Sequence, residues 1–294
     1  MSLRYAYYPG CSLESTGKPY DESIREIFKA LDVELVDIED WNCCGATMYM
    51  SSKKIVGYAL SARNLAIAQQ QGLEVCAPCS SCYTILRKAN RHIQLEPKGR
   101  ERINDALSAA NLSYDGNTNV RHPLDILVND VGIDNIIKKS KFRLTGMKVA
   151  PYYGCQIVRP HGYFDDTDDP QTMDQLLKGL GAEVVYYPPK VRCCGGMLMM
   201  TDEITSLKLC QELIEAGEVN GANVIATACP LCEMNLEAYQ PQINKAFGTN
   251  YKMPILYFSQ LIGMALGIAP VKLGIERMIV PAPKVTLTAK AEAL

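Results

Sequence analysis

The order of apolar and polar positions along the first 90 residues predicts strands that alternate with helices. Apolar side chains at Ile24, Ile27, Phe28 and Leu31 recur with the spacing of one helix face, which predicts a helix over 21–31. Short apolar or alternating runs bounded by turn residues predict strands. The elements expected around this helix are strands over 4–8, 33–38 and 73–76, a helix over 51–71, and a helix that carries Cys82. Strands separated by helices favour a parallel sheet with helices on its faces, so an α/β fold is expected.

The same order of elements returns after residue 146. The expected strands there are 147–153, 182–187, 223–228 and 254–258, and the expected helices are 172–180, 202–217, one opened by Cys229, and 260–266 with Ser259 as its N-cap. Residues 91–145 are charged and predict two bridging helices, over 100–110 and 124–138. The expected organisation is a first domain over 1–90, a helical connector over 91–145, a second domain over 146–280 and a flexible tail over 281–294.

Charge and hydropathy limit the partners of the chain. The net charge is −2, which gives no support for a nucleic-acid-binding surface, so small molecules or proteins are expected as partners. Residues 253–271 contain no charged side chain, but Pro254 and Pro270 interrupt them. We expect a buried strand and helix there rather than a membrane span, the alternative being a patch that faces a membrane or a partner. No secretory signal is readable at the start, so a cytoplasmic location is expected.

Ten of the twelve cysteines form two copies of one pattern. A lone cysteine comes first, then a double cysteine followed by glycine, then a Cys-x-x-Cys pair, and 34 residues separate the double cysteine from the pair in both copies. The two sets are Cys11, Cys43, Cys44, Cys79 and Cys82, and Cys155, Cys193, Cys194, Cys229 and Cys232. In a reducing cytosol such cysteines are expected to be metal ligands or redox groups rather than disulfides.

Five thiols in each copy exceed what ordinary metal sites use. A structural zinc site takes four ligands, and so does a cubane [4Fe–4S] cluster. A disulfide between the adjacent cysteines Cys43 and Cys44 would be strained, since consecutive Cα atoms lie about 3.8 Å apart. Three alternatives follow. The first is an iron–sulfur cluster, with either a spare ligand or a form larger or more open than a cubane; the others are zinc in at least one copy and catalytic thiols without a metal. Cys76 and Cys210 have no counterpart in the other half and are expected to be buried free thiols.

The cysteine motifs resemble a known family. The segments that carry the likeness are Tyr8-Pro9-Gly10-Cys11-Ser12-Leu13, Trp41-Asn42-Cys43-Cys44-Gly45-Ala46-Thr47, Tyr153-Gly154-Cys155 and Ala228-Cys229-Pro230-Leu231-Cys232. The doubled pattern resembles the CCG-domain family that includes the B subunit of heterodisulfide reductase. This resemblance extends over nearly the whole chain, to about Gly274.

The resemblance implies two Rossmann-like CCG domains, with small parallel sheets flanked by helices, related by a pseudo-twofold axis. Each set of five cysteines is implied to hold a noncubane [4Fe–4S] cluster, with a disulfide cleaved between the two clusters. Electrons are implied to come from a ferredoxin-like iron–sulfur subunit that is fed by a flavin-containing subunit. Two alternatives are a non-catalytic electron-transfer subunit of a larger redox complex and a sulfur-oxidation variant that acts on protein-bound lipoyl thiols.

Cationic side chains near the cysteines are candidates for binding an anionic thiol or disulfide substrate. Arg159 and His161 follow Cys155, and Lys190 and Arg192 precede Cys193. The alternative for each is a solvated surface charge. No glycine-rich phosphate-binding motif is present in the sequence to suggest a nucleotide site.

Overall fold

Two four-stranded parallel sheets form the centre of the protein. The computed structural model describes residues 3–46, 48–285 and 287–289. The first sheet has the order β2-β1-β3-β4 and the second has the order β7-β6-β8-β9. Their strands are β1 (Leu3–Tyr7), β2 (Val33–Asp37), β3 (Val75–Cys76), β4 (Val120–Arg121), β6 (Lys148–Tyr152), β7 (Glu183–Val184), β8 (Val224–Thr227) and β9 (Ile255–Tyr257). The expected α/β architecture with two small parallel sheets is confirmed.

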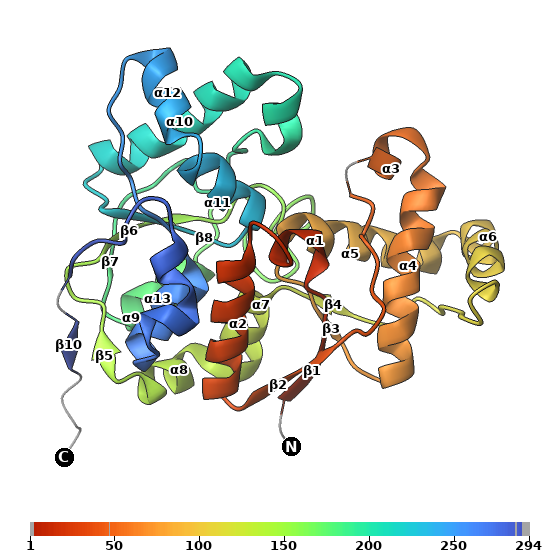
Figure 1. Ribbon diagram of the computed structural model, residues 1–294. Helices are drawn as coiled ribbons and strands as arrows, with labels where there is room; N and C mark the ends of the chain where they lie inside the picture. Colours follow the sequence, from red (N-terminus) through yellow and green to blue (C-terminus); the bar gives the residue numbers. More distant parts are fainter. Residues whose placement is uncertain (1–2, 47, 286, 290–294) are drawn as a thin grey trace.

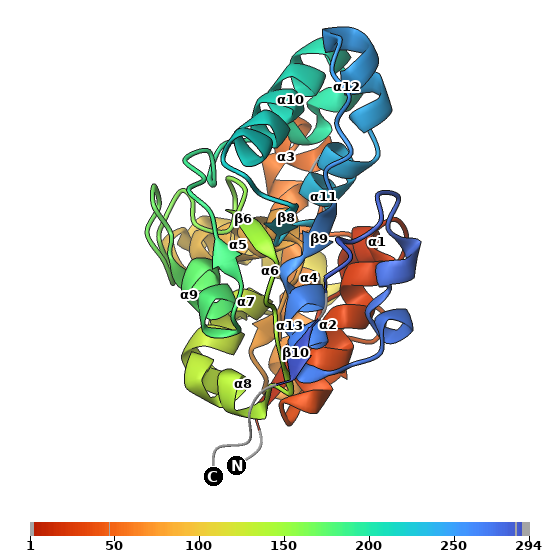
Figure 2. The ribbon, with the colours of Figure 1, turned by 90° about the vertical axis from the view of Figure 1, so that its left-hand side faces the viewer.

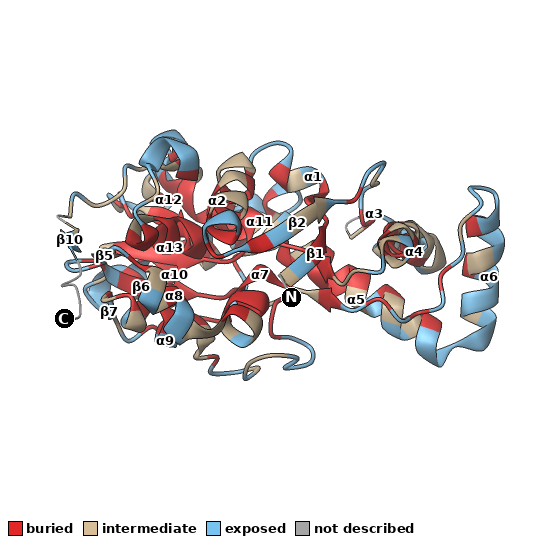
Figure 3. Ribbon diagram, turned by 90° about the horizontal axis from the view of Figure 1, so that it is seen from below, coloured by how far each residue is buried: buried red, intermediate tan, exposed pale blue. Residues whose placement is uncertain are grey.

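Helices flank both sheets (Figure 1). Those of the first half are α1 (Gly10–Leu13), α2 (Lys18–Ala30), α3 (Met48–Ser52), α4 (Lys54–Gln71), α5 (Ser80–Leu95) and α6 (Pro97–Ser108). Those of the second half are α9 (Thr172–Gly179), η2 (Gly196–Met200), α10 (Glu203–Val219), α11 (Pro230–Glu237), α12 (Gln240–Phe247), α13 (Phe258–Leu266), η3 (Pro270–Leu273) and η4 (Ile275–Arg277). Most residues of β1, β3, β6, β8 and β9 are buried, whereas the edge strands β2 and β7 are partly exposed and α6 exposes one side to solvent (Figure 3).

Residues 91–145, expected as a helical connector, also supply a strand to the first sheet. β4 pairs in parallel with β3, through Val75 opposite Val120. Val120 is buried. A strand of two residues is too short to be predicted from its own sequence, and β4 is stabilised by its packing in the sheet. The helix expected over 124–138 is divided into α7 (Pro123–Asp125), the π-helix η1 (Ile126–Gly132) and α8 (Ile133–Lys139).

Two further expectations change at the C-terminal side. α13 begins at Phe258, and the backbone N–H of Tyr257 donates to the side chain of Gln260. Ser259 is therefore not the N-cap, and its hydroxyl bonds instead to Ser23 at 2.6 Å. In the expected tail, β10 (Thr288–Ala289) pairs antiparallel with β5 (Phe142–Arg143), while positions 286 and 290–294 lie outside the described residues.

The two halves pack against each other through α2 and α13, which lie side by side in both views (Figures 1 and 2). The ring of Tyr20 stacks on that of Tyr257, with centroids 4.3 Å apart and planes nearly parallel. Both rings are fully buried, and burying a large side chain contributes about 1.5–3 kcal/mol. Among the described residues no helix is both long and apolar enough to cross a membrane, and the uncharged stretch 253–271 forms β9, α13 and the start of η3.

Candidate metal centres

The cysteines follow the carboxyl ends of neighbouring parallel strands. Cys11 comes after β1, the double cysteine after β2, and Cys79 after β3, and these three strands are adjacent in the first sheet. The second half repeats this placement with Cys155 after β6 and Cys229 after β8. Because the carboxyl ends of parallel strands meet at one edge, each set of five is drawn together at the place where open α/β sheets bind ligands.

The first set combines buried and exposed thiols. The Sγ atoms of Cys44 and Cys82 lie 3.3 Å apart, and both side chains are buried. Cys43 is exposed, and its Sγ atom accepts the backbone N–H of Gly45 at 3.5 Å. The hydroxyl of Ser61 on α4 donates to the carbonyl oxygen of Cys44 at 2.9 Å. These bonds fix the loop of the double cysteine to the helix that follows it.

The second set repeats these contacts. The Sγ atoms of Cys194 and Cys232 lie 3.5 Å apart. Cys193 is exposed and accepts the backbone N–H of Gly195 at 3.3 Å. The hydroxyl of Ser206 on α10 donates to the carbonyl oxygen of Cys194 at 3.4 Å. Each half therefore presents the same arrangement of one buried and one exposed thiol in the double cysteine.

A glycine makes room for the last cysteine of each set. Gly10 and Gly154 precede Cys11 and Cys155 and have positive φ angles of 67° and 70°. A Cβ atom on Gly10 would lie 3.0 Å from the Sγ atom of Cys82, and one on Gly154 would lie 3.2 Å from that of Cys232. In both halves the backbone therefore lies so close to a thiol that a side chain would crowd it. Glycine avoids this contact and also adopts the positive φ without strain.

We expect Gly154→Ala to weaken cofactor binding at the second set. The change adds a methyl group against a thiol at a positive φ, which costs about 1–3 kcal/mol. Metal content and thermal unfolding of the purified variant, compared with those of Gly221→Ala, check this prediction. Gly221 also has a positive φ of 78° but no atom near its Cβ position, so this control separates backbone strain from crowding at the site. Equal metal loss in both variants would contradict the crowding argument.

Neighbouring thiols share protons in both sets. Hydrogen bonds with Cys43 and then Cys82 lower the pKa of Cys44 to about 4. A hydrogen bond with Cys155 is the main cause that lowers the pKa of Cys193 to about 2. The same bonds raise the pKa values of the donors Cys43 and Cys155. The lowered pKa values of Cys44 and Cys193 favour the thiolate, which is the form of cysteine that binds metals.

The donor set fits an iron–sulfur cluster. All twelve cysteines are free thiols. The ten of the two sets lie on loops after the strands or, for Cys11, Cys82 and Cys232, at the start of the helices that follow. Among the described residues no three His, Cys, Asp or Glu side chains form a group suited to one metal ion. Converging thiolates with glycine at the point of closest approach are of the kind that holds a polynuclear cluster.

A small cavity opens next to the second set. It has a volume of about 40 Å³ and is lined by Cys155, Cys193, Cys194, Cys229 and Cys232 together with Ser80, Ser81, Tyr153, Gly154, Gln156, Gly196 and Leu231. Ser80 and Ser81 belong to the Cys-x-x-Cys segment of the first half. The hydroxyl of Ser80 also donates to the carbonyl oxygen of Ala228 at 3.2 Å. Two residues between Cys79 and Cys82 of the first set thus line the cavity of the second.

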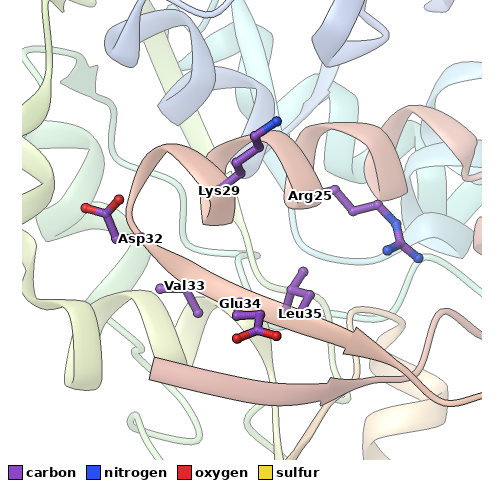
Figure 4. Close-up of a pocket in the computed structure, with 6 residues that line it drawn as sticks. All are labelled: Arg25, Lys29, Asp32, Val33, Glu34 and Leu35. Atoms are coloured by element: carbon purple, nitrogen blue, oxygen red, sulfur yellow. The ribbon is translucent and has the colours of Figure 1, made fainter. Parts of the chain in front are cut away.

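A larger cavity of about 380 Å³ lies alongside α2 and β2 (Figure 4). Its walls carry Arg25 and Lys29 from the helix and Asp32, Glu34 and two apolar side chains from the strand region. No cysteine lines it, so it is not part of the metal centres.

His122 joins the two Cys-x-x-Cys segments. Its Nε2 atom lies 3.1 Å from the carbonyl oxygen of Pro78 and 3.2 Å from that of Ala228. These two residues directly precede Cys79 and Cys229. The Nδ1 atom accepts the backbone N–H of Leu124, so the proton lies on Nε2 and is shared between the two carbonyl groups.

The ring of His122 is fully buried. This burial lowers the pKa of the imidazole to about 4, so the ring is neutral at physiological pH. Nothing in the local sequence distinguishes His122 from an ordinary surface or core histidine. Its role was missed, as was that of Ser80, because each depends on contacts between the two halves that no local pattern encodes. The equal spacing of 150 residues between the two bonded carbonyl groups is the one signal that could have pointed to a shared contact.

Lys190, a candidate for binding a substrate anion, is buried and already bonded. Its Nζ atom lies 3.0 Å from carboxylate oxygens of both Asp169 and Asp174. Its backbone carbonyl accepts the N–H groups of Tyr153 and Gly154. The structure thus places Lys190 as a support for the loop that leads to Cys155.

Two other candidate cations also have carboxylate partners. Arg159 pairs with Asp168 at 2.6 Å, and Arg192 pairs with Glu212 at 2.8 Å. His161 is exposed, and its ring packs edge-on against a tyrosine in the same loop. None of the four candidate cations lines the cavity beside the second set, and their role as substrate contacts stays a prediction.

Comparison with known proteins agrees with this arrangement. The chain matches the family described as CCG, a cysteine-rich domain, at residues 5–87 and again at 149–237. Each matched segment contains one complete set of five cysteines. The chain belongs to the CCG cysteine-rich domain family. The resemblance seen in the cysteine motifs is confirmed.

Several known proteins are similar to this chain over most of its length. The 8-methylmenaquinol:fumarate reductase membrane anchor subunit of Wolinella succinogenes is 33% identical, with 97% of this chain and 99% of the relative covered. A protein of Archaeoglobus profundus described as like the B subunit of heterodisulfide reductase is 32% identical, with 92% and 93% covered. The B subunit of the ferredoxin/F420H2-dependent CoB-CoM heterodisulfide reductase of Methanosarcina acetivorans is 30% identical, with 93% of each covered.

A solved structure supports the fold of this CCG protein. The crystal structure of a hypothetical protein from Helicobacter pylori matches with a TM-score of 0.79 at 14% identity. The match covers 96% of this chain and 53% of that chain. At this identity the likeness concerns the fold alone.

Proposed function

We propose that this chain is the iron–sulfur subunit of a heterodisulfide-reductase-like complex, which cleaves or forms a disulfide between two noncubane [4Fe–4S] clusters. The observation that carries the proposal is that the Cys-x-x-Cys segments of the two sets share contacts at the interface of the halves. His122 bonds to the carbonyl groups before Cys79 and Cys229, and Ser80, which follows Cys79 of the first set, lines the cavity of the second. The similarity to heterodisulfide reductase B subunits supports it.

The chemistry balances with two one-electron sites. Reduction of a disulfide breaks one S–S bond and consumes two electrons and two protons, giving two thiols. When bound, each cluster would supply one of the two electrons. The five cysteines of each set would hold the clusters, and the exposed Cys43 and Cys193 are the thiols nearest to solvent in the double cysteines. The partners proposed are a ferredoxin-like iron–sulfur subunit and a flavin-containing subunit, in the cytoplasm.

Iron and sulfide analysis tests this proposal. We expect about eight iron atoms and acid-labile sulfide in each chain, as two [4Fe–4S] clusters require. After mild oxidation with a thiol present, electron paramagnetic resonance is expected to show a signal that depends on the thiol. Two zinc ions with no iron would rule out the redox function.

A second candidate is a non-catalytic electron-transfer subunit of a larger redox complex. It is favoured by the similarity to the fumarate reductase subunit of Wolinella succinogenes, which covers 97% of this chain. The same experiment separates the two functions. Iron–sulfur clusters whose paramagnetic signal does not respond to any thiol would favour electron transfer alone.

A further inference from the structure

The two halves carry equivalent groups of three helices with opposite charge. α4, α5 and α6 pack together beside the first cysteine set, and α10 packs against α11 and α12 beside the second. α5 and α11 both begin after the first cysteine of a Cys-x-x-Cys pair. The two groups lie far apart, one at the right and the other at the upper left of Figure 1.

The charges of the two groups differ strongly. α4, α5 and α6 contain eight Lys and Arg residues and two acidic ones. α10, α11 and α12 contain two Lys residues and six Glu residues. The two helix groups thus occupy equivalent places in a duplicated backbone but carry opposite net charges. The whole chain is nearly neutral.

The positive charge gathers around a groove between α4, α5 and α6, which we call the basic groove. Two adjoining cavities of about 330 Å³ each form it, and both are lined by Lys54, Tyr58, His92 and Glu96. The other cations that line it are Lys88, Arg91, Lys98 and Arg102. Within the part of the chain that the structure describes, none of the five Lys and Arg side chains of the groove takes part in an ion pair. This holds even though Glu96 lines the same groove.

The basic groove lies close to the first cysteine set. Cys82 is in the first turn of α5, and Lys88 and Arg91 lie six and nine residues further along the same helix. These offsets correspond to a rise of about 9 and 14 Å. At the other wall, Gly57 of α4 packs against Gly45, which follows the double cysteine, with 3.4 Å from its Cα to the Cβ position of Gly45.

We propose that the basic groove is the docking surface of an acidic protein that exchanges electrons with the first cysteine set. The proposal rests on the proposed redox function. Unpaired cations attract an acidic surface and raise the rate of encounter. The acidic helices of the second half repel the same partner. The partner can therefore dock beside the first cysteine set but not at the equivalent surface beside the second.

The shape and composition of the groove favour a protein over other polyanions. It is concave, and Glu96, which lies between α5 and α6, lines it together with the cations. A flat anionic membrane cannot follow a recess between helices. A phosphate backbone has no cation to pair with Glu96, whereas a protein surface can present both signs of charge.

Binding of a small ferredoxin of net negative charge tests the proposal. The dissociation constant is measured by calorimetry with the purified, cluster-loaded chain at low and at high salt. Charge reversal of two exposed residues, Lys88→Glu with Arg91→Glu, is expected to weaken binding at least about tenfold. The matched control, Lys178→Glu with Lys245→Glu on α9 and α12, changes the net charge equally and is expected to change binding less than about twofold.

A second variant protects the test against misfolding. Lys98→Glu with Arg102→Glu alters the α6 wall and is expected to weaken ferredoxin binding as much as the first pair does. It replaces the first pair in the test if that variant fails to fold. Equal weakening by the control, binding that does not respond to salt, or failure of the native chain to bind the ferredoxin would overturn the proposal. Preferential binding to phosphatidylglycerol vesicles or to polyuridylate would also overturn it. Salt-dependent ferredoxin binding by a chain that contains no iron would leave the docking surface standing and refute the proposed function.

Discussion

Replacing Cys194 by serine is expected to empty the second site while the first stays loaded, so the iron content falls to about half. Cys194 is buried, its Sγ atom lies 3.5 Å from that of Cys232, and its carbonyl is tied to α10. A serine hydroxyl binds iron more weakly than a thiolate does, since it stays protonated at neutral pH. The proposed thiol-dependent paramagnetic signal should be lost with the second cluster. Metal analysis and resonance spectra of the purified variant measure both effects.

The matched variants are Cys44→Ser and Cys76→Ala. Cys44 has the equivalent contacts in the first half, so its loss should also halve the iron content. Cys76 is fully buried in β3 and belongs to neither set. Its replacement should leave the iron content unchanged and lower the free energy of unfolding by only about 1 kcal/mol. Full iron content in Cys194→Ser, or loss of iron in Cys76→Ala, would contradict the assignment of the second set.

Replacing His122 by leucine is expected to lower the free energy of unfolding by about 2–4 kcal/mol. The change removes the one N–H group that serves the carbonyl oxygens of both Pro78 and Ala228, and an unsatisfied buried polar group costs about 1–3 kcal/mol. Ser80 still reaches Ala228, which limits the loss on that side. His122→Gln keeps an N–H group near the same place and should recover part of the loss. Urea unfolding of both variants gives the measurement.

The pH dependence of stability gives a second measure of His122. Burial lowers the pKa of its ring to about 4 in the folded chain, against about 6.5 when unfolded. The unfolded chain therefore binds the proton first, and the stability present above pH 6.5 falls as the pH drops toward 4. His122→Gln should remove this part of the slope. Tyr83→Phe, which alters a ring 5.8 Å from His122, serves as the control, and an unchanged slope in His122→Gln would refute the argument.

Much of the fold follows from local patterns in the sequence. The helical face that contains Ile24 and Phe28 correctly places α2, and the longer strands β1, β2 and β6 were expected within two residues. β4 was not expected, because two residues carry too little periodicity and their partners lie more than 40 residues earlier in β3. Ser259 looked like a cap because capping is judged locally, while its actual partner, Ser23, is 236 residues away.

The same distinction applies to the candidate site. The spacing of the cysteines predicted which thiols belong together, since repetition along the chain reflects repetition of the fold. The charges near them were less informative, because nearness in sequence does not say where a side chain points. Lys190 turns to Asp174 and Arg192 turns to Glu212. The basic groove escaped notice because its cations come from three separate helices.

The position of His122 has a consequence for how such a protein can be assembled. Its single ring bonds to the same backbone position in both repeats. Two separate identical subunits related by an exact twofold axis would present either two such rings or none. The contact therefore requires a segment that is present once for the two repeats, as the segment between them is in this chain. A substitution of His122 alters the backbone contacts before Cys79 and Cys229 at the same time. The two repeats therefore cannot change this contact independently of each other.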